Sequence, residues 1–266
     1  MINEQRYVAL VNDILNNGIA RDNERTGTGT ISCFAKTIEI DVSNGTLPIM
    51  THRKMFLKGI IGEVIAFTQG YTNVADFQEA GCNYWNAWAK DDGDLGPIYG
   101  YQWRNFNSKG IDQLQNVIEE AKVNPQSRRL YVTAWNPEQE DDMSLLPCFH
   151  GFQIYIGEKG ELNMLCNMRS SDVIIGLPSD IVFHTVLMHL IANALDRPLG
   201  KLVMSLADAH IYNNHLDFAK SIFGLHLYDE PQFLVNQYAT IDDATQDQFL
   251  LLGYEHGPKA NLEVSV

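Results

Sequence analysis

The sequence lacks the features that mark secreted, membrane and nucleic-acid-binding proteins. It has no run of about eighteen apolar residues, which a membrane-spanning helix needs. Its start, MINEQRYVALVNDIL, lacks the basic start, the long apolar run and the small-residue cleavage site of a secretory signal. Lys and Arg number 19 against 33 Asp and Glu, giving a formal net charge of −14. We therefore do not expect nucleic-acid or membrane partners, because binding a duplex needs clustered basic side chains.

Cysteine is also scarce. The 266 residues include four cysteines, Cys33, Cys82, Cys148 and Cys166, with no CxxC pair and no histidine at metal-ligand spacing. This pattern predicts reduced thiols, no metal site and a cytoplasmic protein, in the cytoplasm of a host cell if the chain is viral. With 45% hydrophobic residues the chain can bury one large core, so we expect a single domain over 1–266.

Hydrophobic periodicity predicts the helices and strands. The expected helices are 7–16, 55–69, 112–122 and 181–194, and the expected strands are 31–42, 128–134, 151–156, 162–168 and 201–206. Helices and strands do not alternate strictly, which favours an α+β fold over a doubly wound parallel sheet. Glu63 lies in an expected helix that is apolar on most sides. Burying a carboxylate is costly, so this residue is a candidate for function.

Cys148 follows a proline at the start of an expected strand. It could be a small buried hydrophobic residue, but a nucleophilic thiolate is the alternative. A thiolate needs positive charge nearby to lower its pKa, and Arg128, Arg129 and Arg169 could supply it. The arginine fork also suits phosphate, and Ser170 follows Arg169 directly. Taken separately, each arginine could equally form a surface ion pair.

Two further segments are rich in polar groups. Arg25 opens RTGTGT, a Gly-rich candidate lid that lacks the lysine and the strand–loop–helix context of a P-loop. The segment 208–215, DAHIYNNH, concentrates hydrogen-bonding side chains after an expected strand. No acidic zinc-binding helix accompanies its histidines, so contacts with a sugar hydroxyl are favoured over a metal.

In their order along the chain, these segments resemble the thymidylate synthase family. They are RTGTGT, Glu63 in its helix, YWNAW with DLGPIYG, SRR, LPC, RSSDVIIGLPSD, DAHIYNNH and the terminal LEVSV. The resemblance implies an α+β fold with a large mixed β-sheet packed by helices, and a homodimer formed through one sheet face. It also implies transfer of a one-carbon unit from 5,10-methylenetetrahydrofolate to carbon 5 of a pyrimidine deoxynucleoside monophosphate, without a metal.

The resemblance implies roles for individual residues. Cys148 would add to carbon 6 of the pyrimidine, Glu63 would transfer protons through ordered water, and Tyr99 would lie near the proton leaving carbon 5. The nucleotide would be bound by Arg25, Arg169, Ser170, Asp172, Asp180, His210 and Tyr212, with Arg128 and Arg129 contributed by the other subunit. The folate pocket would be shaped by Trp85, Asp172, Gly176 and Val266.

Asp180 departs from the family pattern, because the synthases have Asn where this chain reads GLPSD. An Asn amide can accept a hydrogen bond from the ring N–H of uracil and donate one to its carbonyl. A carboxyl group can instead accept from the amino group of cytosine and share one proton with its ring nitrogen. Asp180 therefore favours cytosine, and it joins the catalytic candidates as the residue that meets the reacting base.

Two other departures concern neighbours of the site. Met168 precedes Arg169 where the synthases usually have Gln, a form that resembles phage deoxycytidylate hydroxymethylases, which also carry Asp at the base-reading position. Phe149 follows the cysteine where the synthases have His, and whether His150 replaces that histidine is open.

These departures favour hydroxymethylation of deoxycytidylate. Trp85, Trp88 and the synthase-like tail keep C5-methylation of deoxycytidylate or deoxyuridylate open as an alternative. A third alternative is a non-catalytic RNA-binding regulator on the same scaffold. Such a protein would be expected to lose Cys148 or the phosphate-binding arginines, which this sequence keeps.

Overall fold

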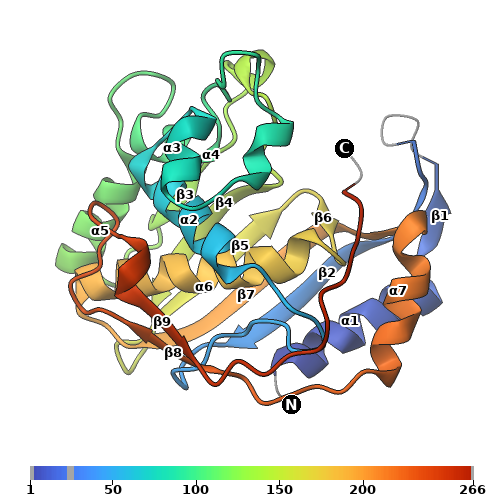
Figure 1. The fold of residues 1–266 in the computed structure, drawn as a ribbon. Coiled ribbons are helices and arrows are strands. Elements are labelled where there is room, and N and C mark those ends of the chain that lie inside the picture. Colours follow the sequence, from blue (N-terminus) through green and yellow to red (C-terminus); the bar gives the residue numbers. More distant parts are fainter. Residues whose placement is uncertain (1–2, 23–26, 265–266) are drawn as a thin grey trace.

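The computed structural model describes residues 3–22 and 27–264. Within these residues the main sheet has seven strands, in the order β1-β2-β7-β5-β4-β3 with β6 beside β7 (Figure 1). Its pairs are antiparallel apart from the parallel pairs β5–β7 and β6–β7, so the sheet is mixed as expected. The strands are β1 (Ile19–Arg21), β2 (Thr30–Asp41), β3 (Tyr131–Thr133), β4 (Phe149–Ile156), β5 (Leu162–Met168), β6 (Ser171–Asp172) and β7 (Leu199–Tyr212), with β8 (Gln232–Val235) and β9 (Phe249–Leu252) forming a separate hairpin.

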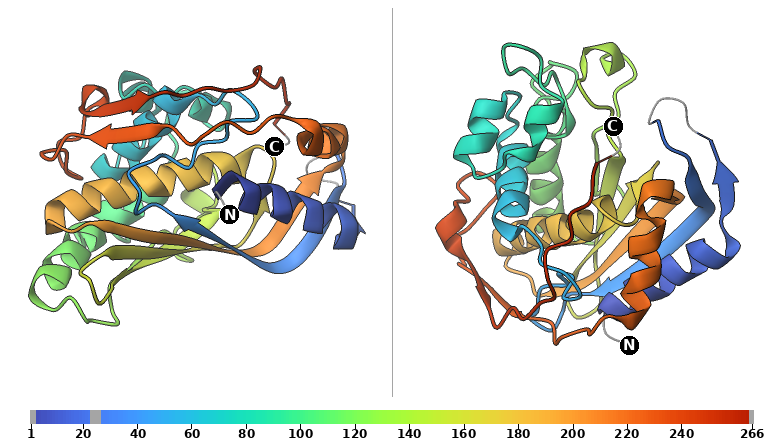
Figure 2. Two further views of the ribbon diagram at one scale, coloured as in Figure 1. Left: turned by 90° about the horizontal axis from the view of Figure 1, so that it is seen from below. Right: turned by 45° about the vertical axis from the view of Figure 1, so that its right-hand side comes forward.

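Helices pack on one side of this sheet. The long helix α6 lies against β5 and β7, and α2 packs on α6 (Figure 2). Most residues of α6 are buried, as its nearly continuous apolar sequence predicts. The α-helices are α1 (Asn3–Asn17), α2 (Leu57–Gln69), α3 (Val74–Glu79), α4 (Tyr99–Arg104), α5 (Gln113–Val123), α6 (Gly176–Leu195) and α7 (Leu216–Ser221). None of the helices in the described ranges is long and apolar enough to cross a membrane.

The other side of the sheet exposes hydrophobic side chains. Side chains alternate along a strand, so residues next to those that face α6 point the opposite way. Tyr131, Tyr155 and Leu165 are exposed by 41%, 65% and 38%, whereas Phe152 and Cys166 on the helix side are buried. An apolar sheet face of this kind is typical of a surface that a partner covers.

The structure confirms several expected elements and corrects others. The strand at 162–168 has the expected bounds, and the second helix ends before Gly70, whose φ of 72° suits a glycine cap. The strand expected at 128–134 is confined to Tyr131–Thr133, so Arg128 and Arg129 lie in the loop before it. The strand expected at 201–206 extends to Tyr212 as part of β7, so the polar segment starting at 208 lies largely within that strand instead of after it.

Candidate active site

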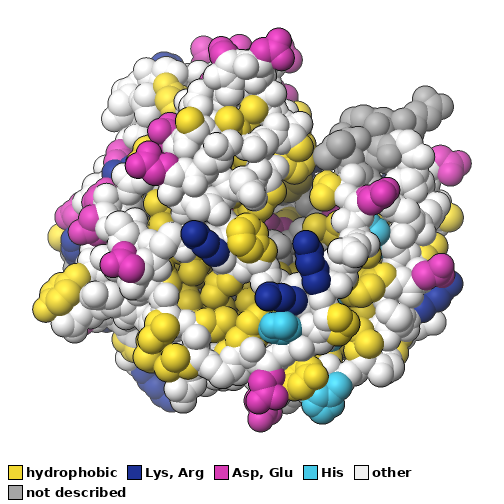
Figure 3. Space-filling model, viewed as in Figure 1, with side chains coloured by type: hydrophobic (Ala, Val, Ile, Leu, Met, Phe, Trp, Pro, Cys, Tyr) yellow, Lys and Arg dark blue, Asp and Glu magenta, His cyan; other side chains and the backbone are white. Residues whose placement is uncertain are grey.

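Most of the predicted site residues gather where the ends of the central strands meet α2, α4 and η1, a 3-10 helix at Tyr84–Ala87. Figure 3 shows that this face is hollowed between the part of the surface that carries α3 and α4 and the part formed by the N-terminal strands, with hydrophobic, basic and acidic side chains around the hollow. The polypeptide reaches this place from segments far apart in the sequence, so the site depends on the complete fold.

Cys148 is held by its backbone at the start of β4. Its N–H donates to the hydroxyl of Tyr99 at 2.7 Å, and its carbonyl accepts from the N–H of Arg169 at 2.9 Å. Tyr99 is fixed in turn between two rings, at centroid distances of 4.9 Å from Phe67 and 4.5 Å from Phe149. The Cys148 side chain is partly buried. All four cysteines lie in the described part of the chain, and none of them forms a disulfide bond. The predicted nucleophile therefore has a rigid backbone and an accessible location.

Arg169 places its positive charge against the cysteine segment. Its Nε donates to the carbonyl oxygen of Pro147, and its Nη2 donates to that of Leu146, both at 2.9 Å. Its guanidinium also lies 5.8 Å from the centroid of the Trp135 ring. This arrangement places a cation beside the two residues that precede Cys148, and the rest of the exposed guanidinium can meet an anion from solvent.

Glu63 is partly buried in α2 and receives two short hydrogen bonds. The Tyr84 hydroxyl donates to its Oε2 and the Trp85 indole N–H donates to its Oε1, both at 2.6 Å. Burial raises the pKa of Glu63 to about 7, although these two hydrogen bonds oppose the rise. A carboxyl group with this pKa can both accept and release a proton near neutral pH.

Asp180 lies in α6, partly buried and close to two other carboxyl groups. Burial, followed by the negative charges of Glu63 and Asp172, raises the pKa of Asp180 well above its usual value. Asp180 is therefore favoured in its protonated form, which offers one O–H donor beside an acceptor oxygen. Gly176 lies between the two aspartates, since a Cβ built on it would be 3.7 Å from both Asp172 Cβ and Asp180 Oδ2.

The short strand β6 and the end of β7 bring further predicted residues together. Asp172 pairs with His210 in the β6–β7 ladder, and its Oδ1 accepts from the backbone N–H of Ile174 at 2.9 Å. His210 Nδ1 is 3.3 Å from Oδ1 of Asp208, and its ring lies edge-on to Tyr212 at a centroid distance of 4.9 Å. The hydrogen-bonding groups of 208–212 thus lie beside Asp172 at the end of the sheet.

The neighbours of the cysteine differ in what they contact. Phe149 is buried among aromatic rings, 4.8 Å from the ring of His184. His150 is partly buried, and burial followed by the charge of Arg169 lowers its pKa. The lowered pKa favours a neutral His150 imidazole near Arg169. The synthases have their histidine one position earlier, where this chain has Phe149.

Other predicted residues lie elsewhere or outside the described ranges. Arg128 and Arg129 are exposed before β3, at the opposite end of the β3–β4 ladder from Cys148. Within one chain they are therefore remote from the nucleophile. Arg25 and Val266 lie outside the described residues. The segment leading to the C-terminus does reach the site region, since the carbonyl of Glu263 is 2.9 Å from His215 Nε2.

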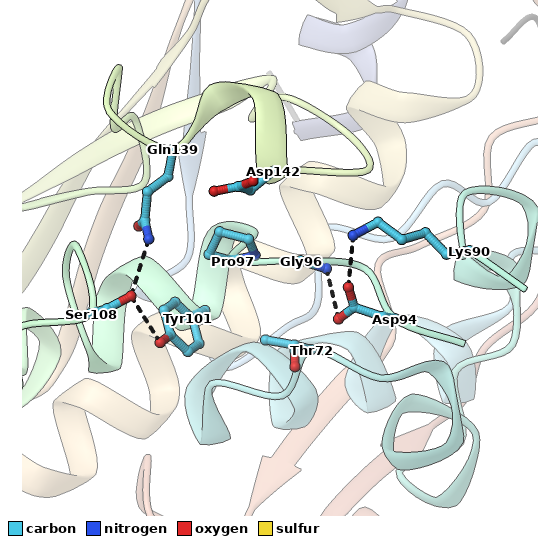
Figure 4. Close-up of a pocket in the computed structure, with 9 residues that line it drawn as sticks. All are labelled: Thr72, Lys90, Asp94, Gly96, Pro97, Tyr101, Ser108, Gln139 and Asp142. Carbon is cyan, nitrogen blue, oxygen red and sulfur yellow. Dashed lines mark hydrogen bonds and ion pairs between the residues drawn. The ribbon is translucent and has the colours of Figure 1, made fainter. Parts of the chain in front are cut away.

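A second hollow lies on the α3–α4 side of the molecule (Figure 4). It has a volume of about 380 Å³, and its polar groups mostly bond to one another, as in the Lys90–Asp94 ion pair at 2.8 Å. None of the described site residues lines it. Within the described ranges, there is also no group of three or more His, Cys, Asp or Glu side chains that could hold a metal ion.

Sequence reasoning missed Tyr84 and His184. Tyr84 is the residue before Trp85 in YWNAW, and this adjacency is the only signal that could have drawn attention to it. His184 Nδ1 lies 2.7 Å from the carbonyl oxygen of Asp180, and its Nε2 lies 3.1 Å from Cys166 Sγ. That contact joins α6 to β5 and is invisible in the sequence.

Comparison with known families agrees with this geometry. The family model described as thymidylate synthase matches residues 5–266. The chain belongs to the thymidylate synthase family, and its fold is the mixed α+β fold expected from that resemblance. Members of this family bind a pyrimidine nucleotide and methylenetetrahydrofolate and transfer a one-carbon unit to carbon 5 of the base, so this protein is a one-carbon transferase.

Proposed function

We propose that this enzyme, a single catalytic domain over 1–266, transfers a hydroxymethyl group to carbon 5 of deoxycytidylate. The observation that carries the proposal is Asp180, whose raised pKa favours a protonated carboxyl in the cleft. Its O–H would donate to the unprotonated ring nitrogen of cytosine, and its other oxygen would accept from the amino group. Uracil presents the opposite pattern along this edge, so a neutral carboxyl in this orientation discriminates against it.

Cys148 would begin the reaction by bonding to carbon 6 of the base, which makes carbon 5 nucleophilic. Tyr99, whose hydroxyl already touches the Cys148 backbone, would lie beside the proton that leaves carbon 5. Glu63 would accept and return protons through water. Release of Cys148 from carbon 6 would then restore the ring double bond and complete the turnover.

The hollow at the candidate active site has features that fit a folate. Trp88 is partly exposed and packs against Trp85 at a centroid distance of 5.5 Å, which provides an aromatic surface for a flat ring. Methylenetetrahydrofolate would supply the one-carbon unit. Trp85, Asp172 and Gly176 would border its pocket, and the terminal Val266 would help to close it over the reacting atoms.

The nucleotide would be held at both ends. Arg169 and Ser170 would contact the 5′-phosphate together with Arg25, and His210 with Tyr212 would contact the 3′-hydroxyl. Support for this orientation comes from the backbone: Arg169 adjoins the Cys148 segment, whereas His210 lies on β7 across from Asp172. Asp172 would contribute to the nucleotide side as well as to the folate side.

Arg128 and Arg129 would complete the phosphate site of a second subunit in a homodimer. Their remoteness from Cys148 within one chain and the exposed apolar face of the sheet both support this arrangement. Mixing Cys148→Ser protein with Arg128→Ala/Arg129→Ala protein should restore activity, because one of the two sites in each mixed dimer is intact. Random exchange of equal amounts predicts about a quarter of normal activity. Each variant incubated alone is the control, and no recovery after verified subunit exchange would contradict shared sites.

The identity of the product separates the proposed reaction from methylation. Mass spectrometry of deoxycytidylate after turnover with methylenetetrahydrofolate should show 5-hydroxymethyldeoxycytidylate, because water adds its oxygen to the one-carbon unit. Methylation would instead transfer a hydride and produce dihydrofolate, detected as growing absorbance. That absorbance change, with either deoxycytidylate or deoxyuridylate, would refute hydroxymethylation. Failure of both nucleotides to react would favour the RNA-binding regulator.

A further inference from the structure

Tyr84 contacts the group that is central to proton transfer, yet the family resemblance gave it no role. The residue and its neighbour Trp85 form the first turn of η1 and grip the Glu63 carboxyl from one side, one donor on each oxygen. Both contacts are 2.6 Å long, which is typical of strong hydrogen bonds to a charged acceptor. A carboxyl group held at both oxygens cannot rotate freely.

The surroundings of Glu63 make the Tyr84 contact unusual. The titratable groups that face Glu63 are the Cys82 thiol, the hydroxyls of Tyr84 and Tyr99, and the Asp180 carboxyl. The Cys82 thiol, the Tyr99 hydroxyl and the Asp180 carboxyl become negatively charged when they ionise. None of these three groups can therefore stabilise a negative charge on Glu63 by ion pairing. Hydrogen-bond donors such as the Tyr84 hydroxyl and the Trp85 N–H are therefore the groups that stabilise the ionised form.

We propose that Tyr84 is a positioning residue that holds the Glu63 carboxyl in place for proton transfer at the pyrimidine. The inference rests on the proposed function and deepens it. Burial of Tyr84 keeps its own hydroxyl protonated by raising its pKa well above the usual value, so the hydroxyl acts as a fixed donor. Glu63 receives that donated bond on Oε2, which favours the carboxylate over the carboxylic acid.

Capture of water is one of the proton-transfer steps that depend on this arrangement. The water oxygen bonds to the exocyclic carbon on C5, and the proton from the broken O–H bond passes to the Glu63 carboxylate. The electron pair of the exocyclic double bond moves into the ring, and the bond between Cys148 Sγ and carbon 6 then breaks to restore the C5–C6 double bond. A misplaced or protonated Glu63 cannot accept the proton in this step.

The test is Tyr84→Phe, which keeps the ring and removes the hydroxyl. Turnover is measured by tritium release from carbon 5 of deoxycytidylate across a range of pH. We expect the acidic limb of kcat/KM to move to higher pH by about one unit or more, because Glu63 loses a donor to its ionised form. At neutral pH, kcat should fall by about 10-fold while the nucleotide KM changes by less than about threefold.

Tyr101→Phe is the matched control. The Tyr101 hydroxyl also makes side-chain hydrogen bonds, with Ser108 at 3.2 Å and Asn105 at 2.9 Å. Tyr101 and Ser108 line the second hollow (Figure 4) and not the candidate site. This variant should keep the pH profile of the unmodified enzyme, and a loss of folding in either variant would appear in its thermal unfolding. An unshifted acidic limb in folded Tyr84→Phe protein would overturn the inference.

The product of the unmodified enzyme separates this inference from the proposed function. Tritium is released from carbon 5 once per turnover in hydroxymethylation and in methylation alike. If the product is 5-methyldeoxycytidylate, the proposed function is wrong, and the water-capture step falls with it. A shifted acidic limb in Tyr84→Phe would still support Tyr84 as the residue that positions Glu63. If the product is 5-hydroxymethyldeoxycytidylate and the limb does not shift, the Tyr84 inference alone is wrong.

Discussion

Cys148→Ser should reduce turnover of deoxycytidylate by at least about 10⁴-fold, because a serine hydroxyl ionises far less readily than a thiol and cannot add to carbon 6. Nucleotide binding should survive the change. The backbone bonds from this residue to Tyr99 and Arg169 are kept when the side chain is replaced. Tritium release measures the first effect, and calorimetric titration with deoxycytidylate measures the second.

Cys33→Ser is the control for this experiment. Cys33 is a buried thiol in β2 that pairs with Ala209 of β7. Because side chains alternate along a strand, it points away from the neighbouring site residues Asp208 and His210, so its replacement should affect stability more than turnover. Residual activity above about one tenth in Cys148→Ser would mean that another group attacks the base. Loss of nucleotide binding would mean that the thiol itself supports the site.

Asp180→Asn should change the preferred base. The ratio of kcat/KM for deoxycytidylate to that for deoxyuridylate should fall by about 10³-fold or more, because polar mismatch at a buried edge discriminates strongly. The asparagine amide offers a donor and an acceptor that match uracil. Parallel tritium-release assays with the two nucleotides give the ratio directly.

A second aspartate of the same helix provides the control. Asp196 caps the C-terminal end of α6 at a φ of 51°, a conformation that asparagine also adopts readily. Asp196→Asn should leave the base ratio within about twofold of the unmodified enzyme. An unchanged ratio in Asp180→Asn would remove the physical basis for preferring cytosine.

Local sequence pattern was sufficient for some elements and not for others. The strand β5 alternates buried and less buried residues along its whole length, so its bounds could be read from periodicity. The end of β7 escaped detection because Asp208 and His210 are polar residues on strand positions, which the tertiary structure pairs with β2 and β6. The aromatic helix α4 contains Gly100 and is too short to show a helical period.

The same distinction applies to the site. Glu63 stood out because a carboxyl group in an apolar helix needs a physical reason, and the structure supplies its partners, Tyr84 and Trp85. The raised pKa of Asp180 could not be read from the sequence, because it depends on burial and on carboxyl groups from two other segments. Family resemblance indicated which residues matter, whereas their electrostatics required the fold.

The two carbonyl contacts of Arg169 have a consequence for nucleotide binding. The guanidinium that would meet the incoming phosphate also fixes the backbone at Leu146 and Pro147, immediately before the nucleophile. Its five N–H groups allow both tasks at once. A phosphate bound by Arg169 would therefore also stabilise the backbone just before Cys148, so nucleotide binding and placement of the sulfur would be linked.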